Sequence, residues 1–291
     1  MQPATIATLA QVIADSRPVA ILTGAGISTD SGIPDYRGAG TPPRTPMNIA
    51  EFMNDPLYRK RFWAGASVNA RRGWNVSPNP GHFALAALEA RGYAEGVITQ
   101  NVDGLHRDAG TKHLVELHGS GASIRCTSCT GHFSRAAVID WFEQANPGYV
   151  ESQKAAEIAP DGDAQVTGIE HLTVPVCPIC TGVLRPEVVY FGETVPKPVF
   201  AAAADLVERA GALAVIGSSL AVNTGIRLVR IAEQRGVPLI VINRGPTAVD
   251  HKTDLRIESG ATETLTALVD ALGIAPGTSL DAETSRGLPA S

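Results

Sequence analysis

Short apolar runs alternate with amphipathic stretches along most of the chain. The runs at residues 19–23, 213–216 and 238–242 are almost entirely apolar, as is typical of buried strands, and shorter ones lie at 97–99, 114–117 and 187–191. Apolar residues recur at helical spacing near 6–15, 49–72, 81–90, 199–209, 224–235 and 262–272. This alternation predicts an α/β fold built on a mostly parallel, doubly wound sheet.

The alternation stops between residues 119 and 186, which we interpret as an insertion that forms a second, smaller domain. Prolines and polar turn residues over 32–46 predict a long loop. Asn79 and Pro80 resemble an N-cap and the first position of a helix. The small, polar residues 276–291 predict a disordered tail after a folded region that spans 1–275.

Composition narrows the class of protein. The 291 residues include 24 Lys and Arg against 29 Asp and Glu, a formal net charge of −5, which argues against a strongly basic nucleic-acid binder. No apolar run reaches the 18 or so residues of a membrane helix. The first residues lack the features of an export or transit signal, so we expect a cytoplasmic protein with neither membrane nor nucleic acid as a direct partner.

The four cysteines form two pairs, Cys126/Cys129 and Cys177/Cys180, each with the C-x-x-C spacing. Two such turns supply the four thiolates of a tetrahedral Zn²⁺ site, and a fully occupied coordination shell makes the metal structural rather than catalytic. The alternatives are two independent redox pairs or free buried thiols. Acidic residues between the pairs argue against a nucleic-acid-binding zinc ribbon.

Gly24-Ala25-Gly26 follows the first predicted strand, and such a turn opens many nucleotide-binding units. Thr29 stands where a third glycine would complete the dinucleotide fingerprint, and no lysine follows to make a phosphate loop. Glycines would still let backbone N–H groups approach a pyrophosphate closely. The alternative is a purely structural turn between strand and helix.

Several longer motifs decide between these readings. They are residues 24–38 (GAGISTDSGIPDYRG), 78–82 (PNPGH), 99–106 (TQNVDGLH), 117–119 (LHG), the two cysteine pairs, 185–193 (RPEVVYFGE), 217–220 (GSSL) and Asn243. Together they resemble, in family order, the sirtuins, which are NAD-dependent protein-lysine deacylases. The resemblance covers residues 1–272 and implies a Rossmann-like domain with a smaller zinc-binding and helical domain, with NAD bound between the two.

Within the family, the chain looks most similar to the class II branch, which includes a human mitochondrial sirtuin with lipoamidase activity. The pointers are Tyr36 in place of a common Phe, the long segment around 158–163, and residues 243–247 (NRGPT).

The resemblance implies three catalytic residues. His118 would be the general base that takes a proton from the ribose, a task suited to a neutral imidazole. Asn101 would orient water and ribose, and Asp103 would hold the nicotinamide amide. From the residues alone, His118 also fits a structural histidine beside a glycine turn, and Asp103 fits a helix cap.

Further residues are implied to bind NAD. In addition to the catalytic three, they are Gly24, Ala25, Gly26, Thr29, Asp35, Tyr36, Arg37, Gln100, Gly217, Ser218, Ser219, Asn243, Arg244 and Ala261. Arg37 would meet phosphate or ribose, Tyr36 would cover the reacting carbon, and Ala261 would lie near adenine. The alternative for residues 35–37 is a solvated loop.

The substrate implied is an acyl-lysine protein or peptide, paired as a strand against Val189, Tyr190, Phe191, Gly192 and Glu193. An ordinary core strand is the alternative for this segment. Ala66 and Asn69 stand where succinyl-preferring sirtuins carry Tyr and Arg, so we expect a neutral, and with small residues such as Ser67 a longer, acyl chain.

The leading hypothesis is therefore an NAD-consuming deacylase that transfers the acyl group to ADP-ribose. The alternatives are a protein ADP-ribosyltransferase with the same site and a non-catalytic NAD-sensing module.

Overall fold

The computed structural model describes residues 3–35, 48–71, 76–153 and 166–275. They belong to two compact units, each described here by itself. The larger comprises Met1–Gly40, Ser77–Leu117 and Val195–Ser291, and the smaller comprises Thr41–Val76 and His118–Thr194.

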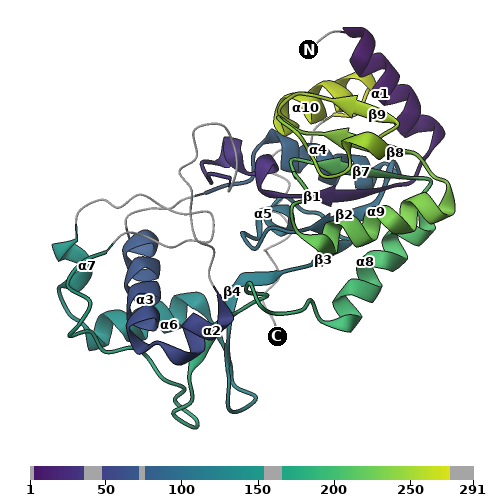
Figure 1. Cartoon of the computed structure of the whole chain (residues 1–291). Coiled ribbons are helices and arrows are strands. Elements are labelled where there is room, and N and C mark those ends of the chain that lie inside the picture. Colours follow the sequence, from purple (N-terminus) through teal and green to yellow (C-terminus); the bar gives the residue numbers. More distant parts are fainter. Residues whose placement is uncertain (1–2, 36–47, 72–75, 154–165, 276–291) are drawn as a thin grey trace, which may run out of the picture. The chain divides into compact units, whose positions relative to one another are not determined.

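The larger unit contains a six-stranded parallel sheet with the strand order β3-β2-β1-β7-β8-β9 (Figure 1). The strands are β1 (Val19–Thr23), β2 (Ala94–Thr99), β3 (Leu114–Glu116), β7 (Ala212–Ile216), β8 (Leu239–Ile242) and β9 (Leu255–Ile257). The order reverses between β1 and β7, as in Rossmann folds, which bind ligands beyond the carboxyl ends of the strands at that point. The predicted fold class is confirmed.

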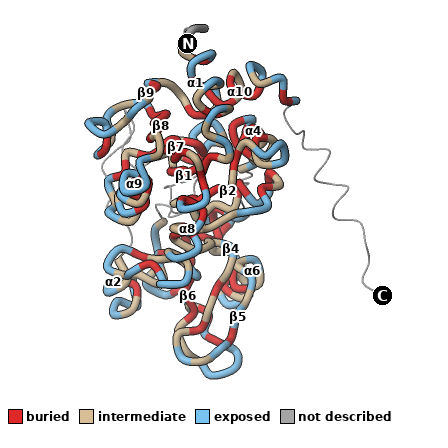
Figure 2. The backbone as a smooth tube through the Cα atoms, turned by 90° about the vertical axis from the view of Figure 1, so that its right-hand side faces the viewer, coloured by how far each residue is buried: buried red, intermediate tan, exposed pale blue. Residues whose placement is uncertain are grey.

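Helices cover both faces of this sheet (Figure 1). Helices α1 (Pro3–Asp15), α4 (Pro80–Ala90) and α10 (Ala261–Ala271) pack together on one face, and α8 (Lys197–Arg209) and α9 (Asn223–Arg235) on the other. The central strands β1, β7 and β8 are buried throughout, which explains their continuous apolar sequences (Figure 2). Short helices follow β1 and β2, namely η1 (Ala25–Ile27), η2 (Thr29–Ser31) and α5 (Leu105–Asp108), and η3 (Asp250–Lys252) precedes β9.

The N-cap prediction for α4 is confirmed. The Asn79 side chain accepts a hydrogen bond from Gly81 N–H, and His82 Nδ1 accepts one from Asn79 N–H, with Pro80 in the first turn.

The smaller unit is built on an antiparallel sheet with the order β5-β4-β6. Its elements are β4 (Gly119–Cys126), β5 (His132–Ser134), β6 (Leu184–Val188), α2 (Ile49–Asn54), α3 (Pro56–Arg71), α6 (Arg135–Ala145) and α7 (Tyr149–Ser152). Phe52, Phe62, Trp63 and Phe142 form the centre of its core, and all four are buried. The smaller unit thus contains the cysteine-bearing insertion together with helices α2 and α3, which come earlier in the chain.

Two predicted elements differ in the structure. The single helix expected over 49–72 is two helices, because Asp55 is extended before Pro56, whose ring disfavours a helical residue in front of it. The strand expected over 187–191 ends at Val188, and a turn with Gly192 at φ +92° follows it. The apolar pattern of the sequence does not predict strands β4, β5 and β9.

Among the described helices, none is both long enough and apolar enough to cross a membrane.

Candidate active site and metal centre

The loops after β1 and β7 touch through their backbones. Gly24 N–H donates to Ile216 O at 3.1 Å, and Gly26 N–H donates to Gly217 O at 2.8 Å. A Cβ on Gly26 would lie 2.8 Å from Gly217 Cα, so the contact excludes a side chain there. These two N–H groups are engaged within the protein, and the contact between the loops requires glycine at both positions. The predicted role of Gly24 and Gly26 in NAD binding stays a prediction.

Three polar side chains meet where β1 and β2 end. Ser28 Oγ donates to Asp103 Oδ2 at 2.8 Å and lies 3.2 Å from Asn101 Nδ2, which also donates to Gly24 O at 3.1 Å. Ser28 is 1% exposed. The sequence analysis missed Ser28 as a site residue, although its place in the glycine-rich motif was the available signal. The structure therefore brings Asn101 and Asp103 together through a serine on the neighbouring loop.

Asp103 carries out two tasks. Its Oδ1 accepts a hydrogen bond from Leu105 N–H at 3.0 Å, a turn that precedes α5, whose N-cap is Gly104, while Oδ2 faces Ser28. Burial raises the pKa of Asp103 above its ordinary value, although the hydrogen bonds from Leu105 and Ser28 oppose that shift.

A second link joins β2 to β7. Gln100 Nε2 donates to Ser218 Oγ at 3.1 Å, and Ser218 Oγ also accepts from Leu220 N–H. Ser219 follows in the same loop and is half-buried. The predicted residues Gln100, Gly217 and Ser218 thus lie together at the point where the strand order reverses.

The residues predicted for the adenosine end gather after β8. Asn243 Nδ2 donates to the carbonyl oxygens of Arg244 and Gly245 and so shapes its own turn. A Cβ on Gly260 would lie 2.7 Å from Arg244 Nη2, which places the guanidinium beside the residue before Ala261. Thr29 donates to Gly26 O at 3.2 Å, and Asp35 is half-buried at the end of a described segment. Tyr36 and Arg37 lie outside the described residues.

His118 begins the second segment of the smaller unit and is half-buried. Its carbonyl oxygen accepts a hydrogen bond from Val189 N–H at 2.8 Å. The next residue, Gly119, has φ +76°, and a Cβ there would lie 2.1 Å from Glu187 O. The backbone of the predicted base is therefore tied to the first residue of the predicted substrate segment.

An ion pair between buried Arg185 and half-buried Glu193 organises the rest of that segment. Arg185, 4% exposed, donates through Nη1 and Nη2 to the two carboxylate oxygens of Glu193 at 2.7 and 2.6 Å. Glu193 Oε2 also accepts from Tyr190 N–H, and the guanidinium lies 4.7 Å from the Tyr190 ring centroid. Tyr190 is buried, whereas Phe191 is 46% exposed. Beyond Val188, the predicted strand is therefore a turn held by the Arg185–Glu193 ion pair, with the apolar side chain of Phe191 at its surface.

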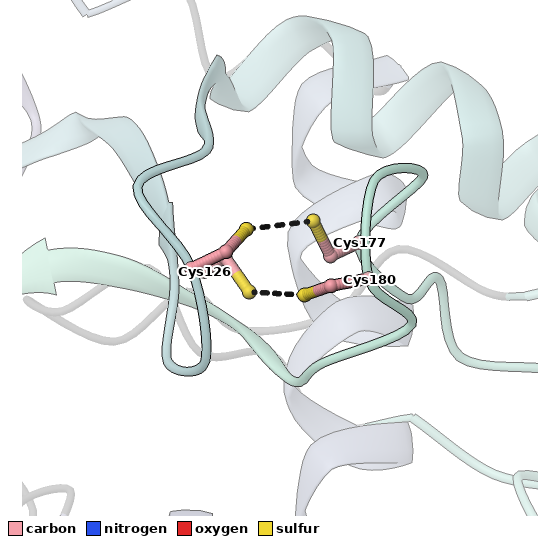
Figure 3. A group of neighbouring side chains, drawn as sticks. Cys126, Cys177 and Cys180 are labelled. Carbon is pink, nitrogen blue, oxygen red and sulfur yellow. Dashed lines mark hydrogen bonds between the residues drawn. The ribbon is translucent and has the colours of Figure 1, made fainter.

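The four cysteines cluster in the smaller unit (Figure 3). Their sulfur atoms all lie within 4.8 Å of one another, with Cys126–Cys180 at 3.5 Å and Cys129–Cys177 at 3.6 Å, and no disulfide joins them. Tetrahedral Zn–S bonds of about 2.3 Å separate sulfurs by about 3.8 Å, so the cluster fits Zn²⁺. Ser128 N–H donates to Cys126 Sγ and lowers the pKa of that thiol, which favours the thiolate.

The two cysteine turns have the same construction. Cys126 N–H donates to Gly131 O, and Cys177 N–H donates to Gly182 O, both at 2.9 Å. Each pair is followed by Thr-Gly in the sequence, a repeated C-x-x-C-T-G that the sequence analysis did not use. That repeat was a direct signal that both turns have one shape.

A sequence profile of the Sir2 family matches residues 24–224. The chain belongs to the Sir2 family. Among its Sir2 relatives, NAD-dependent protein deacetylase 1 of Mycobacterium avium (strain 104) is 46% identical over 277 residues, which cover 94% of this chain and 96% of that protein. The NAD-dependent protein deacetylase of Xanthomonas axonopodis pv. citri (strain 306) is 42% identical over 265 residues, 90% of each chain.

Solved Sir2 structures share the fold of this family member. A Sir2 complex with a p53 peptide and NAD⁺ superposes with a TM-score of 0.74 at 32% identity, covering 92% of this chain and 98% of that one. Sir2 bound to an acetylated peptide gives 0.73 at 30% identity, covering 94% and 100%.

Proposed function

We propose that this Sir2 protein is an NAD-dependent protein-lysine deacylase that removes acetyl or longer acyl groups. The observation that carries the proposal is the partly buried Ser28–Asn101–Asp103 cluster beyond the carboxyl ends of β1 and β2, next to the reversal in strand order. A carboxylate and an amide at this place match the donor and acceptor of nicotinamide. The activity is also the one named for its relatives in M. avium and X. axonopodis.

In the proposed reaction, the bond between nicotinamide and ribose C1′ breaks and the acyl-amide oxygen of lysine bonds to C1′. His118 accepts a proton from a ribose hydroxyl, and water then releases free lysine and acyl-ADP-ribose. Asn101 orients the ribose and the water, and Asp103 receives the nicotinamide amide. Correct placement of these groups supplies most of the catalytic effect, because the oxocarbenium-like transition state needs a dry, ordered site.

The remaining assignments support this reaction. The Gln100–Ser218 link would face ribose and phosphates, and Asn243, Arg244 and Ala261 would hold the adenosine end. Residues 189–193 would pair with the acyl-lysine peptide, in the way that a strand adds to an edge. The four cysteines would hold one structural zinc ion that takes no part in the reaction.

The class II assignment is a finer proposal, supported by Tyr36, by the long segment around 158–163 and by residues 243–247. With Ala66 and Asn69 on α3 in place of a Tyr and Arg pair, the proposed acyl group is neutral.

The test is to incubate the protein with NAD and a panel of acetyl-, succinyl- and lipoyl-lysine peptides. Chromatography then measures the nicotinamide released with each peptide. Release that requires peptide, is lost in His118→Ala and persists in His171→Ala supports the deacylase, since His171 is an exposed histidine of the same unit. Release without peptide, together with ADP-ribose on protein, would identify a transferase instead. NAD binding without any release would identify a sensing module, and equal rates across the panel would contradict the acyl preference.

A further inference from the structure

Two buried histidines of the larger unit have no role in the proposed chemistry. His82 on α4 is 0% exposed and His106 on α5 is 1% exposed. Their ring centroids lie 4.8 Å apart with the planes tilted by 59°. Both rings are neutral near pH 7, because burial lowers the pKa of His82 to about 4 and burial together with His82 lowers the pKa of His106.

The neighbours of each ring define its tautomer. Asn79 N–H donates to His82 Nδ1 at 3.3 Å, so the proton of neutral His82 is on Nε2. Thr23 Oγ1 donates to Thr99 Oγ1 at 2.9 Å, and it therefore accepts from His106 Nε2–H, which is also 2.9 Å away. This leaves His106 Nδ1 as an acceptor.

One nitrogen on each ring remains. His82 Nε2 and His106 Nδ1 are both enclosed, and neither has a hydrogen-bond partner among the described residues. With these tautomers one is a donor and the other an acceptor on adjacent rings. A buried polar atom without a partner is unfavourable, and here a complementary pair of such atoms occurs together.

We propose that one enclosed water links His82 Nε2–H to His106 Nδ1, accepting from the first and donating to the second, and that the resulting chain positions Asn101. The chain runs from Asn79 N–H through His82, His106 and Thr23 to Thr99. Thr99 Oγ1 also accepts from Asn101 N–H at 3.1 Å, so the last link holds the backbone of Asn101 itself. His82 and His106 are positioning residues in this scheme, whose kinetic consequence rests on the proposed deacylase function.

The link between the rings is tested first without reference to activity. ¹⁵N NMR of the histidine rings in the folded protein at pH 7 should show both rings neutral, with both protons on Nε2 and slowly exchanging. A proton on His106 Nδ1, or a freely exchanging His82 Nε2–H, would overturn the proposal whether or not the protein is a deacylase.

The positioning role is tested with two conservative variants. His82→Asn keeps an acceptor for Asn79 N–H, and His106→Gln keeps a donor for Thr23, but each removes one side of the proposed link. Each variant should lower kcat by about tenfold while KM for NAD changes less than about twofold, and the double variant should lose little more than either alone.

His113→Gln is the matched control, since His113 is an exposed histidine of the same unit. Folded variants with unchanged kcat, or a double variant whose losses multiply to about a hundredfold, would overturn the positioning role. If the wild-type protein released no nicotinamide with any peptide, the proposed function would fail, and the NMR result would still decide the link between the rings.

Discussion

The carbonyl oxygen of His118 accepts a hydrogen bond from the N–H of Val189 at 2.8 Å. Within the smaller unit, the proposed base and the proposed peptide-binding segment are thus joined by a main-chain hydrogen bond. The link depends on Gly119, because its φ of +76° and its close approach to Glu187 O leave no room for a Cβ. The backbone therefore holds the proposed base next to the proposed peptide-binding segment.

Gly119→Ala should abolish deacylation, since its new Cβ would collide with the Glu187 carbonyl and separate β4 from β6. Gly148→Ala is the matched control: it has φ +79° but open space around it, so it should cost only about 1–2 kcal/mol of left-handed strain. Turnover and urea unfolding of both variants check this. Equal behaviour of the two would show that the contact with Glu187 is unimportant.

The purified protein should contain about one zinc ion per chain. Cys177→Ser should lose the metal and lower the free energy of unfolding of the smaller unit by several kcal/mol, since structural zinc contributes to folding directly. Ile179→Ser alters an exposed residue of the same turn and should retain zinc. Elemental analysis with thiol titration is the measurement, and metal-free protein with two disulfides would rule out the zinc site.

Glu193→Gln should reduce the free energy of unfolding by about 3 kcal/mol, because it leaves the buried Arg185 guanidinium without its carboxylate. Glu187→Gln alters a 46% exposed side chain nearby and should cost less than about 1 kcal/mol. Denaturant unfolding measures both losses of free energy. A loss for Glu193→Gln no larger than that for Glu187→Gln would contradict a stabilising role of the Arg185–Glu193 ion pair.

The same pair predicts an acid-dependent loss of stability. Burial alone would raise the pKa of Glu193, but hydrogen bonds from Arg185 and Tyr190 outweigh it, so the pKa lies below its ordinary value. Its contribution is therefore present above the unfolded pKa of about 4.3 and is lost as pH falls through the lower folded pKa. The free energies of unfolding of wild type and Glu193→Gln should therefore converge once the pH is below the folded pKa of Glu193. A constant difference down to pH 2 would show that ionisation of Glu193 is not the cause.

Ser28→Ala should shift the acid limb of the kcat/KM profile to higher pH. The Ser28 hydroxyl stabilises ionised Asp103, whose pKa burial already raises, so its removal raises that pKa further. It also removes a partner of Asn101 and should lower kcat/KM about tenfold. Ser31→Ala removes a nearby hydroxyl that bonds Asn79 instead and should leave the acid limb in place. An unmoved limb in Ser28→Ala would mean that Asp103 does not control it.

The order of residues along the chain was enough to predict the alternating architecture, the Asn79 cap and the four cysteines that cluster. These features are local or periodic: apolar runs such as 212–216 form buried strands, and a C-x-x-C turn presents two thiolates wherever it lies. Family motifs also located Asn101, Asp103 and His118 along the chain.

Tertiary structure alone decided what those residues touch. Contacts between distant segments, such as Ser28 with Asp103 and His82 with His106, depend on the strand order and on which loops meet, and neither leaves a periodic trace in the sequence. The close approach of Gly26 to Gly217 is likewise a packing reason for glycine that the sequence alone does not show. The helix break at Pro56 arose because one proline overrides the apolar pattern around it. The turn before Glu193 arose because the Arg185–Glu193 ion pair holds residues that the apolar pattern alone predicts as a strand.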